Sequence, residues 1–223
     1  MIPMSSAACR CDVLGSIAHQ YATINESSRR SMKELDVRLA LYNHEIRSIL
    51  DAHPSSLVVD ELGLMEGAFR VDLAVINSRL HGYEIKSYSD NLDRLPSQQN
   101  IYNKIFDRMT LVADERHVPK AVQLVPQWWG LISSRTTKGV TVLNEIWPSR
   151  QNLEVDAYLL SQLLWREEAL DALRQRGLDR GVRTKPRKII WQAVAACLTL
   201  EEIRTVIRSK LAARRGWRTH SYS

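Results

Sequence analysis

Three residues that could together hold a metal ion and handle a proton lie within a short stretch of the chain. Asp72 stands between the apolar Val71 and Leu73, and Glu84 and Lys86 follow 12 and 14 positions later. Hard divalent cations prefer carboxylate oxygens and fill their remaining positions with waters and substrate phosphates. A lysine beside such an ion can orient a water and offset charge on a phosphate. The three residues therefore predict a site that cleaves phosphodiester bonds.

The pattern around these residues predicts the strands that must position them. Short apolar runs bounded by turn residues indicate strands over 57–62, 70–76 and 82–87. Few residues separate the second from the third, which predicts an antiparallel hairpin. Side chains two apart on a strand share a face, so Glu84 and Lys86 point the same way. The alternative is an exposed strand edge with a weak ion pair, which is what Glu-x-Lys usually means. An aspartate inside an apolar strand favours the site, because aspartate is depleted there.

The rest of the chain predicts an α/β fold with a mixed sheet flanked by helices, followed by a helical C-terminal subdomain. The expected helices cover 32–51, 98–108 and 119–125, the further strands 109–113, 128–133 and 140–146, and the C-terminal helices 158–176, 187–197 and 200–214.

Charge is distributed unevenly along the chain. We expect a flexible leader over 1–30, a core over 31–149 and a basic helical tail over 150–223. The tail holds 15 of the 31 Lys and Arg but only 8 of the 25 Asp and Glu, so the remainder holds 16 against 17. The net charge of +6 therefore comes from the tail. This favours a nucleic acid partner, although a basic face is often merely solvated.

Neither a membrane span nor a disulfide framework is indicated. No apolar run reaches the roughly 18 residues of a membrane helix, and the apolar stretch 13–18 has no basic lead-in for a signal peptide. We expect a cytoplasmic protein without a membrane partner. Cys9, Cys11 and Cys197 are odd in number and widely spaced, which favours reduced thiols over disulfides or a zinc site.

Beyond spacing, the residues themselves resemble a known family. The segments Glu61-Leu62-Gly63, Arg70-Val71-Asp72-Leu73-Ala74 and Tyr83-Glu84-Ile85-Lys86 resemble the core of the PD-(D/E)XK nuclease superfamily. The following Asp93-Arg94-Leu95-Pro96-Ser97-Gln98, Tyr102 and Phe106-Asp107-Arg108 are similar to a little-characterised bacterial and phage branch of it. Valine precedes Asp72 where the motif has proline, which leaves the ligands untouched. The likeness covers about residues 32–146.

This resemblance implies a restriction-endonuclease-like core and a metal site. Asp72 and Glu84 would bind Mg²⁺ or Mn²⁺, and Lys86 would assist the attacking water. An acidic residue before the hairpin is often an extra ligand in that superfamily, a position that Glu61 takes here, with Glu66 as a weaker substitute.

The resemblance also implies residues that contact the substrate. A helical glutamine and a tyrosine one turn later lie near the scissile phosphate in the superfamily, and Gln98 and Tyr102 share one helix face at that spacing. Arg70 and Arg94 are candidates for phosphate contacts. Gln98 and Tyr102 equally fit an ordinary polar helix face.

The tail contains a second, looser likeness. A helix, Arg176-Gly177-Leu178, and then Gly181-Val182-Arg183-Thr184-Lys185 are loosely similar to the SAP-type DNA-binding helical hairpin. The side chains that would contact backbone phosphates without reading sequence are Arg183, Lys185, Arg187 and Lys188. The alternative is a helical subdomain packed on the core. The tryptophans at 128, 129, 165, 191 and 217 are assigned to packing.

The sequence thus predicts a Mg²⁺- or Mn²⁺-dependent nuclease acting on nucleic acid, with DNA favoured and a homodimer possible. The alternative is a nucleic-acid-binding or partner-binding module on a nuclease fold with weak or absent chemistry. Retention of Asp72, Glu84 and Lys86 together favours the enzyme.

Overall fold

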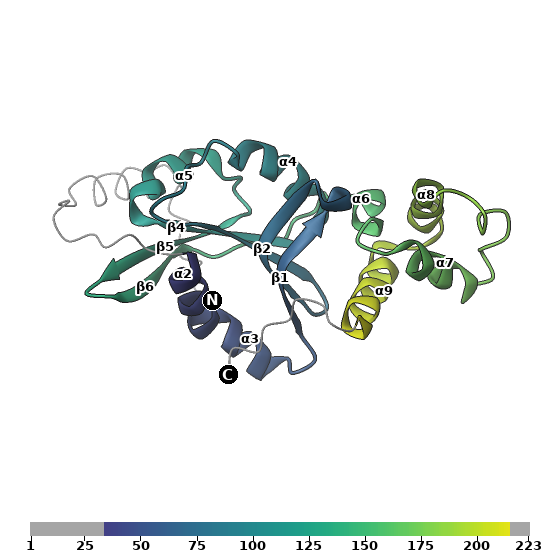
Figure 1. Cartoon of the computed structure of the whole chain (residues 1–223), viewed down its shortest axis with the longest axis horizontal. Helices are drawn as coiled ribbons and strands as arrows, with labels where there is room; N and C mark the ends of the chain where they lie inside the picture. The colour runs from purple at the N-terminus through teal and green to yellow at the C-terminus, as the bar shows by residue number, and fades with distance from the viewer. Residues whose placement is uncertain (1–33, 215–223) are drawn as a thin grey trace, which may run out of the picture.

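The computed structural model describes residues 34–214 and contains a six-stranded mixed sheet with helices on both faces (Figure 1). The strands lie in chain order across the sheet. Strands β1 to β3 pair antiparallel, β3 to β5 parallel, and β6 antiparallel to β5. The expected α/β fold with a mixed sheet and C-terminal helices is confirmed. The expected leader over 1–30, with Cys9 and Cys11, and Trp217 lie outside the described residues.

The first three strands form the antiparallel meander that carries the candidate site. The pairing of β2 with β3 begins at Ile76–Leu80 and ends at Leu73–Tyr83. Beyond that point the end of β3 pairs with β4. The bounds are β1 Leu57–Leu64, a short 3-10 turn Met65–Gly67, β2 Phe69–Ile76 and β3 Leu80–Lys86.

Helices make the crossovers between the parallel strands, as that geometry requires. Pro96 lies in the first turn of α4, where its missing N–H removes no helical bond. The positive φ of Lys138 and Gly139 forms the tight turn between the last two strands. The bounds are α4 Leu95–Ile105, β4 Arg108–Asp114, a 3-10 turn Glu115–His117, α5 Val118–Leu124, β5 Gly130–Thr137 and β6 Val140–Trp147.

The two faces of the sheet are covered by different helices. An N-terminal helix covers one face and α4 with α5 the other (Figure 1). Side chains alternate between the two cores, since Leu73 and Val75 join one cluster and Ala74 and Ile76 the other. The N-terminal helix runs through α2 Glu34–Leu41, a π-helical segment Tyr42–Ile46 and α3 Arg47–Ala52.

The C-terminal helices stand beside the β1–β2 end of the sheet (Figure 1). Their buried side chains belong to the same hydrophobic cluster as the α4 side of the sheet. A buried ion pair joins them to the body, because the Arg204 guanidinium contacts the Asp107 carboxylate. The bounds are α6 Ala157–Ser161, α7 Arg166–Arg174, α8 Arg187–Cys197 and α9 Leu200–Ala213.

Local details differ from the expected pattern. The expected single helix over 158–176 is wrong, since α6 ends at Ser161 and α7 begins at Arg166 after a new N-terminal cap. Glu168 accepts the backbone N–H of Trp165, and this cap starts the second helix. The expectation that Trp165 packs inside the protein is also wrong, because its side chain is 60% exposed. Trp129 and Trp191 are buried, as expected. Cys197 is an exposed free thiol.

Candidate metal and catalytic site

Asp72 lies where β2 and β3 separate. The last residue of β2 that pairs with β3 is Leu73, next to Asp72 in the chain. Asp72 Oδ2 accepts the backbone N–H of Ile85 at 2.6 Å. This bond satisfies a donor that has left the ladder, so it supplies the reason for an aspartate in an apolar strand. Burial, and after it the negative charge of Glu84, raise the pKa of Asp72 well above its ordinary range. The raised pKa means that the ionised form of Asp72 is disfavoured here, and a cation bound beside the carboxylate would favour it again.

Glu84 is a buried carboxylate enclosed by three donors. Its side chain is 1% exposed and accepts from Lys86 Nζ at 2.7 Å. Gln98 Nε2 lies 2.5 Å from Oε1, and the Tyr102 hydroxyl lies 2.9 Å from Oε2. A buried charge without partners would be very costly, so these contacts are what allows Glu84 to be there. The ion pair confirms that Glu84 and Lys86 share a face of β3.

Tyr102 and Gln98 reach this carboxylate from α4, one helical turn apart. Burial, followed by the charge of Glu84, raises the pKa of Tyr102, so the phenol stays protonated and serves as a donor. The same hydroxyl lies 2.6 Å from the Arg70 carbonyl oxygen, and its single proton serves one acceptor at a time. Gln98 Oε1 is buried without a hydrogen-bond partner among the described residues. A buried acceptor without a partner is a place for a hydrogen-bond donor, such as a water, that the described residues do not supply.

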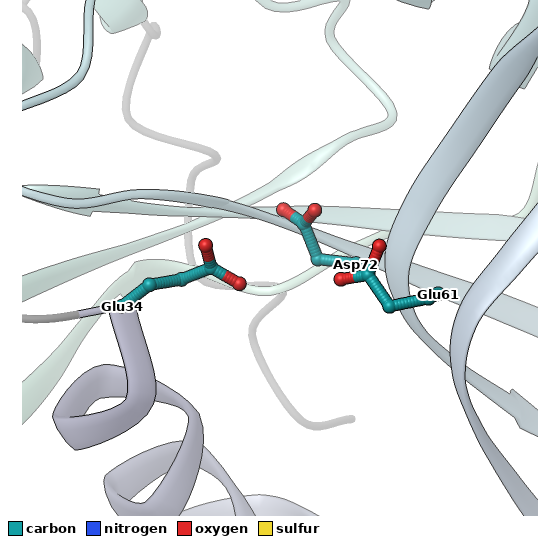
Figure 2. Close-up of side chains that lie close together, drawn as sticks. All are labelled: Glu34, Glu61 and Asp72. Carbon is teal, nitrogen blue, oxygen red and sulfur yellow. The ribbon is translucent and has the colours of Figure 1, made fainter. Parts of the chain in front are cut away.

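Three carboxylates, one of them that of Asp72, converge near Glu84 and Lys86. Glu34, Glu61 and Asp72 each offer an oxygen, and these oxygens lie within 4.8 Å of one another. Figure 2 shows that they come from the start of α2 and from β1 and β2. Glu61 has a φ of 55°, a conformation that residues other than glycine rarely adopt. Strain of this kind persists where the surrounding structure imposes it, and it often marks a functional site.

Arg38, one turn after Glu34 on α2, forms ion pairs with two of these three carboxylates and with Asp60. Its guanidinium donates to Glu34 at 2.5 Å, to Asp60 at 2.8 Å and to Glu61 at 2.9 Å. It also donates to the Asp72 carbonyl oxygen at 2.9 Å. Burial acts to lower the pKa of Arg38, but the bonds from the three carboxylates outweigh it and raise that pKa. The arginine is a permanent positive charge inside the group.

The balance of charge in the site fits a divalent cation. The cations in contact with the site are Arg38, Lys86 and the half-exposed Arg70, whereas the acidic groups are Glu34, Asp60, Glu61, Asp72 and Glu84. Negative groups remain in excess even when Asp72 holds its proton. Converging oxygens and an excess of negative charge are the environment of a hard divalent ion such as Mg²⁺ or Mn²⁺.

The other expected site residues are spread more widely. Arg70 lies beside the acidic group, 3.5 Å from Glu61, with half of its side chain exposed. Arg94 is exposed at the start of α4. Glu66, the weaker candidate ligand, instead pairs with Arg187 of α8.

The four expected phosphate contacts of the tail fall into two kinds. Arg183 is held by Asp179 at 2.6 Å, and Arg187 is held by Glu66, so both carry a partner already. Lys185 and Lys188 are exposed on the turn before α8 and in its first turn. The helix expected over 187–197 is confirmed, because α8 spans Arg187–Cys197 and the basic turn lies just before it.

Glu34 and Arg38 are site residues that the sequence did not indicate. Their spacing of four residues at a helix start is visible in the sequence, but it is typical of an exposed helical ion pair. Arg38 directly follows Val37, which is fully buried, but that burial comes from the fold and not from the sequence pattern. Contact between a helix and a strand more than twenty residues away has no local pattern that would reveal it.

Comparison with known proteins identifies one family model that covers both the sheet and the C-terminal helices. The model of the family described as Bacteriophage P4 protein cII matches residues 27–222. The chain belongs to this family. Protein cII of Enterobacteria phage P4 is 23% identical over 185 residues, which cover 82% of this chain and 68% of that protein. No solved structure matches the chain.

The cII match includes the acidic group and the C-terminal helices, so both are parts of one family unit. Neither the family description nor the name of the relative states an activity. The function must therefore be argued from the site itself. Among the described residues no helix is long and apolar enough to cross a membrane.

Proposed function

We propose that this member of the cII family is a divalent-metal-dependent nuclease of PD-(D/E)XK type that hydrolyses phosphodiester bonds, with DNA as the favoured substrate. One observation carries the proposal. Three carboxylates converge within 4.8 Å beside the Glu84–Lys86 pair, at the point where β2 and β3 separate. A mixed sheet whose antiparallel meander is followed by a helix and a parallel strand supports it as well.

Glu34, Glu61 and Asp72 would hold the ion. A bound Mg²⁺ or Mn²⁺ would supply Lewis-acid stabilisation of phosphate charge and a water of lowered pKa. Glu84 was also expected as a ligand, but both of its oxygens accept from Lys86, Gln98 or Tyr102. Two donors bind its Oε1 and one binds its Oε2, so one of about four lone-pair sites, on Oε2, remains for an ion.

Lys86 would act on the attacking water. Its side chain is 12% exposed, and the bond to Glu84 fixes its ammonium group beside the acidic group. A fixed ammonium orients a water through its protons and offsets negative charge that grows on the phosphate. Gln98 and Tyr102 would position Glu84 and thereby Lys86.

The alternative function, a binding module without chemistry, has its own support. Arg38 already contacts Glu34, Asp60 and Glu61, so the acidic group is partly neutralised without any ion. In that case nucleic acid would bind to the basic tail, and the acidic group would only hold α2 against the sheet.

A metal titration with labelled substrates tests the proposal. Single-stranded, duplex and branched DNA and RNA are incubated with increasing Mg²⁺ or Mn²⁺, and cleavage is followed on gels. We expect metal-dependent cleavage of DNA that Asp72→Asn and Glu34→Gln each reduce by about 10²-fold or more. Asp36→Asn is the matched control, since Asp36 is exposed on the same helix as Glu34. Cleavage that persists at the wild-type rate in both site variants would refute the assignment.

A further inference from the structure

A cleft opens between the β1–β2 turn and the C-terminal helices. Its volume is about 660 Å³, and the segment between α6 and α7 and the start of α8 line its far side. Glu61 belongs both to this cleft and to the converging carboxylates, so the two are continuous. The charged and aromatic side chains on its walls are Arg70, Arg166, Arg187, Arg214, Trp165 and Trp191.

Trp165 is a large aromatic side chain that the fold leaves uncovered. It is 60% exposed, although it lines the cleft. The Arg214 guanidinium lies 4.2 Å from its ring centroid, on one face of the ring. Trp191 behaves differently, because it is buried and its indole N–H donates to the Leu164 carbonyl oxygen at 3.0 Å. Packing therefore explains Trp191 but leaves the exposure of Trp165 without a structural reason.

The charge of the cleft favours an anionic ligand. Four arginines line it against two glutamates, Glu61 and Glu66. Arg70 and Arg187 are about half exposed, and Arg166 keeps 38% of its side chain exposed. Each has an acidic neighbour in the structure, so a ligand would share or replace those ion pairs. Arginines interleaved with an exposed aromatic ring are what single-stranded nucleic acid binds.

We propose that this cleft binds a single-stranded segment of nucleic acid, with an unpaired base stacked on Trp165 and the backbone phosphates along Arg166, Arg187 and Arg70. The inference rests on the proposed nuclease function, since Glu61 would place the strand beside the carboxylates. It adds the substrate class: a single strand or an overhang is bound in preference to blunt duplex.

The size of the cleft supports a single strand over a duplex. Roughly 300–1,000 Å³ is the range of pockets for small molecules, which suits one or two nucleotides. The bases of a duplex are already stacked on one another, so an exposed tryptophan has nothing to gain from them. Every unpaired base offers a free ring face, which makes such binding tolerant of sequence.

Affinity measured without divalent ions tests the proposal separately from cleavage. Fluorescein-labelled oligo-dT and a blunt hairpin duplex are titrated with full-length protein in EDTA, and fluorescence anisotropy is recorded. We expect tighter binding of oligo-dT, and a loss of about tenfold in Trp165→Ala, within the range for one stacked base. Trp165→Phe should keep most of the affinity because it keeps an aromatic face. Leu153→Ala is the matched control, since Leu153 is 87% exposed and outside the cleft.

A second pair of variants tests the phosphate contacts. Arg166→Gln should lower the slope of log affinity against log salt by about 0.7, the value for one phosphate contact on a single strand. Arg174→Gln removes the same charge from the same helix outside the cleft and should leave the slope unchanged.

Two results would overturn the inference. One is an oligo-dT affinity that Trp165→Ala leaves unchanged in a protein with a wild-type circular dichroism spectrum. The other is an equal loss for the blunt duplex, which would make the arginines a general phosphate surface. Failure of the metal titration alone would refute the nuclease and leave these binding measurements standing.

Discussion

Replacing Lys86 by methionine should separate its role in catalysis from its role in folding. Methionine keeps most of the volume of the lysine side chain but removes its charge. The change leaves the Glu84 carboxylate, 1% exposed, without its cationic partner. Removing one partner of a buried pair costs about 3–5 kcal/mol, because the other charge stays buried. Gln98 and Tyr102 still donate to Glu84, and the Lys86 side chain is 12% exposed, so we expect the lower end, about 3 kcal/mol.

The measurement is urea denaturation of four proteins, namely wild type, Lys86→Met, Glu84→Gln and the double variant. The double variant should recover most of the loss, because a neutral amide needs no counter-charge. Turnover should not recover in the double variant, because it lacks the ammonium group just as Lys86→Met does. We expect turnover in these two variants to stay about 10²-fold or more below wild type. A domain with total stability of about 5–15 kcal/mol tolerates this loss and remains folded for assay.

Two results would refute this reasoning. If Lys86→Met lowers stability by less than about 1 kcal/mol, the pair behaves as an exposed ion pair, and Glu84 is solvated rather than buried. If the double variant recovers turnover together with stability, Lys86 supports the fold and not the reaction.

Two further predictions concern the fold. Burial, and after it the charge of Arg108, lower the pKa of His81 from 6.5 to about 3, so from pH 6.5 downward the unfolded chain takes up a proton that the folded chain does not. Stability should therefore fall as the pH drops through that window, by up to about 1.4 kcal/mol per pH unit, and urea titrations of His81→Gln at pH 7 and 5 should show a shallower decrease than wild type. Arg204→Met should destabilise the protein by about 3–5 kcal/mol, because it leaves the buried Asp107 carboxylate without its cationic partner, and adding Asp107→Asn should recover part of the loss in thermal melts.

The order of elements between 34 and 214 follows closely from the sequence, because periodicity and turn residues are local. The strands bearing Asp72 and Glu84 begin and end within two residues of their expected limits. The helix expected over 158–176 failed for a local reason as well. Its apolar pattern continues through the interruption, while the bond from Trp165 to Glu168 that restarts the helix depends on a side-chain geometry that periodicity does not contain.

Only the part of the site that lies on the two neighbouring strands β2 and β3 could be predicted from the sequence. Asp72, Glu84 and Lys86 are found by spacing because a hairpin brings residues of known separation together. Glu34 joins them through the packing of α2 on the sheet, which depends on how Val37 and Leu41 fit against Tyr83 and its neighbours. That contact is tertiary, and a single sequence carries no measure of it.

Arg38 shows how so many carboxylates can stand together in a folded chain. Three of them share its guanidinium, and each carboxylate has two oxygens, so binding one side to the arginine leaves acceptor capacity on the other. The arginine thereby fixes the orientation of Glu34 and Glu61 before any ligand binds, which lowers the cost of ordering them later. It does not neutralise the group, because Asp72 and Glu84 add two further acidic side chains, and the other cations in contact with the site are Lys86 and the half-exposed Arg70. Five acidic side chains against three cations leave an excess of negative charge, and this excess is the physical reason to favour an ion-binding site over a helix anchor.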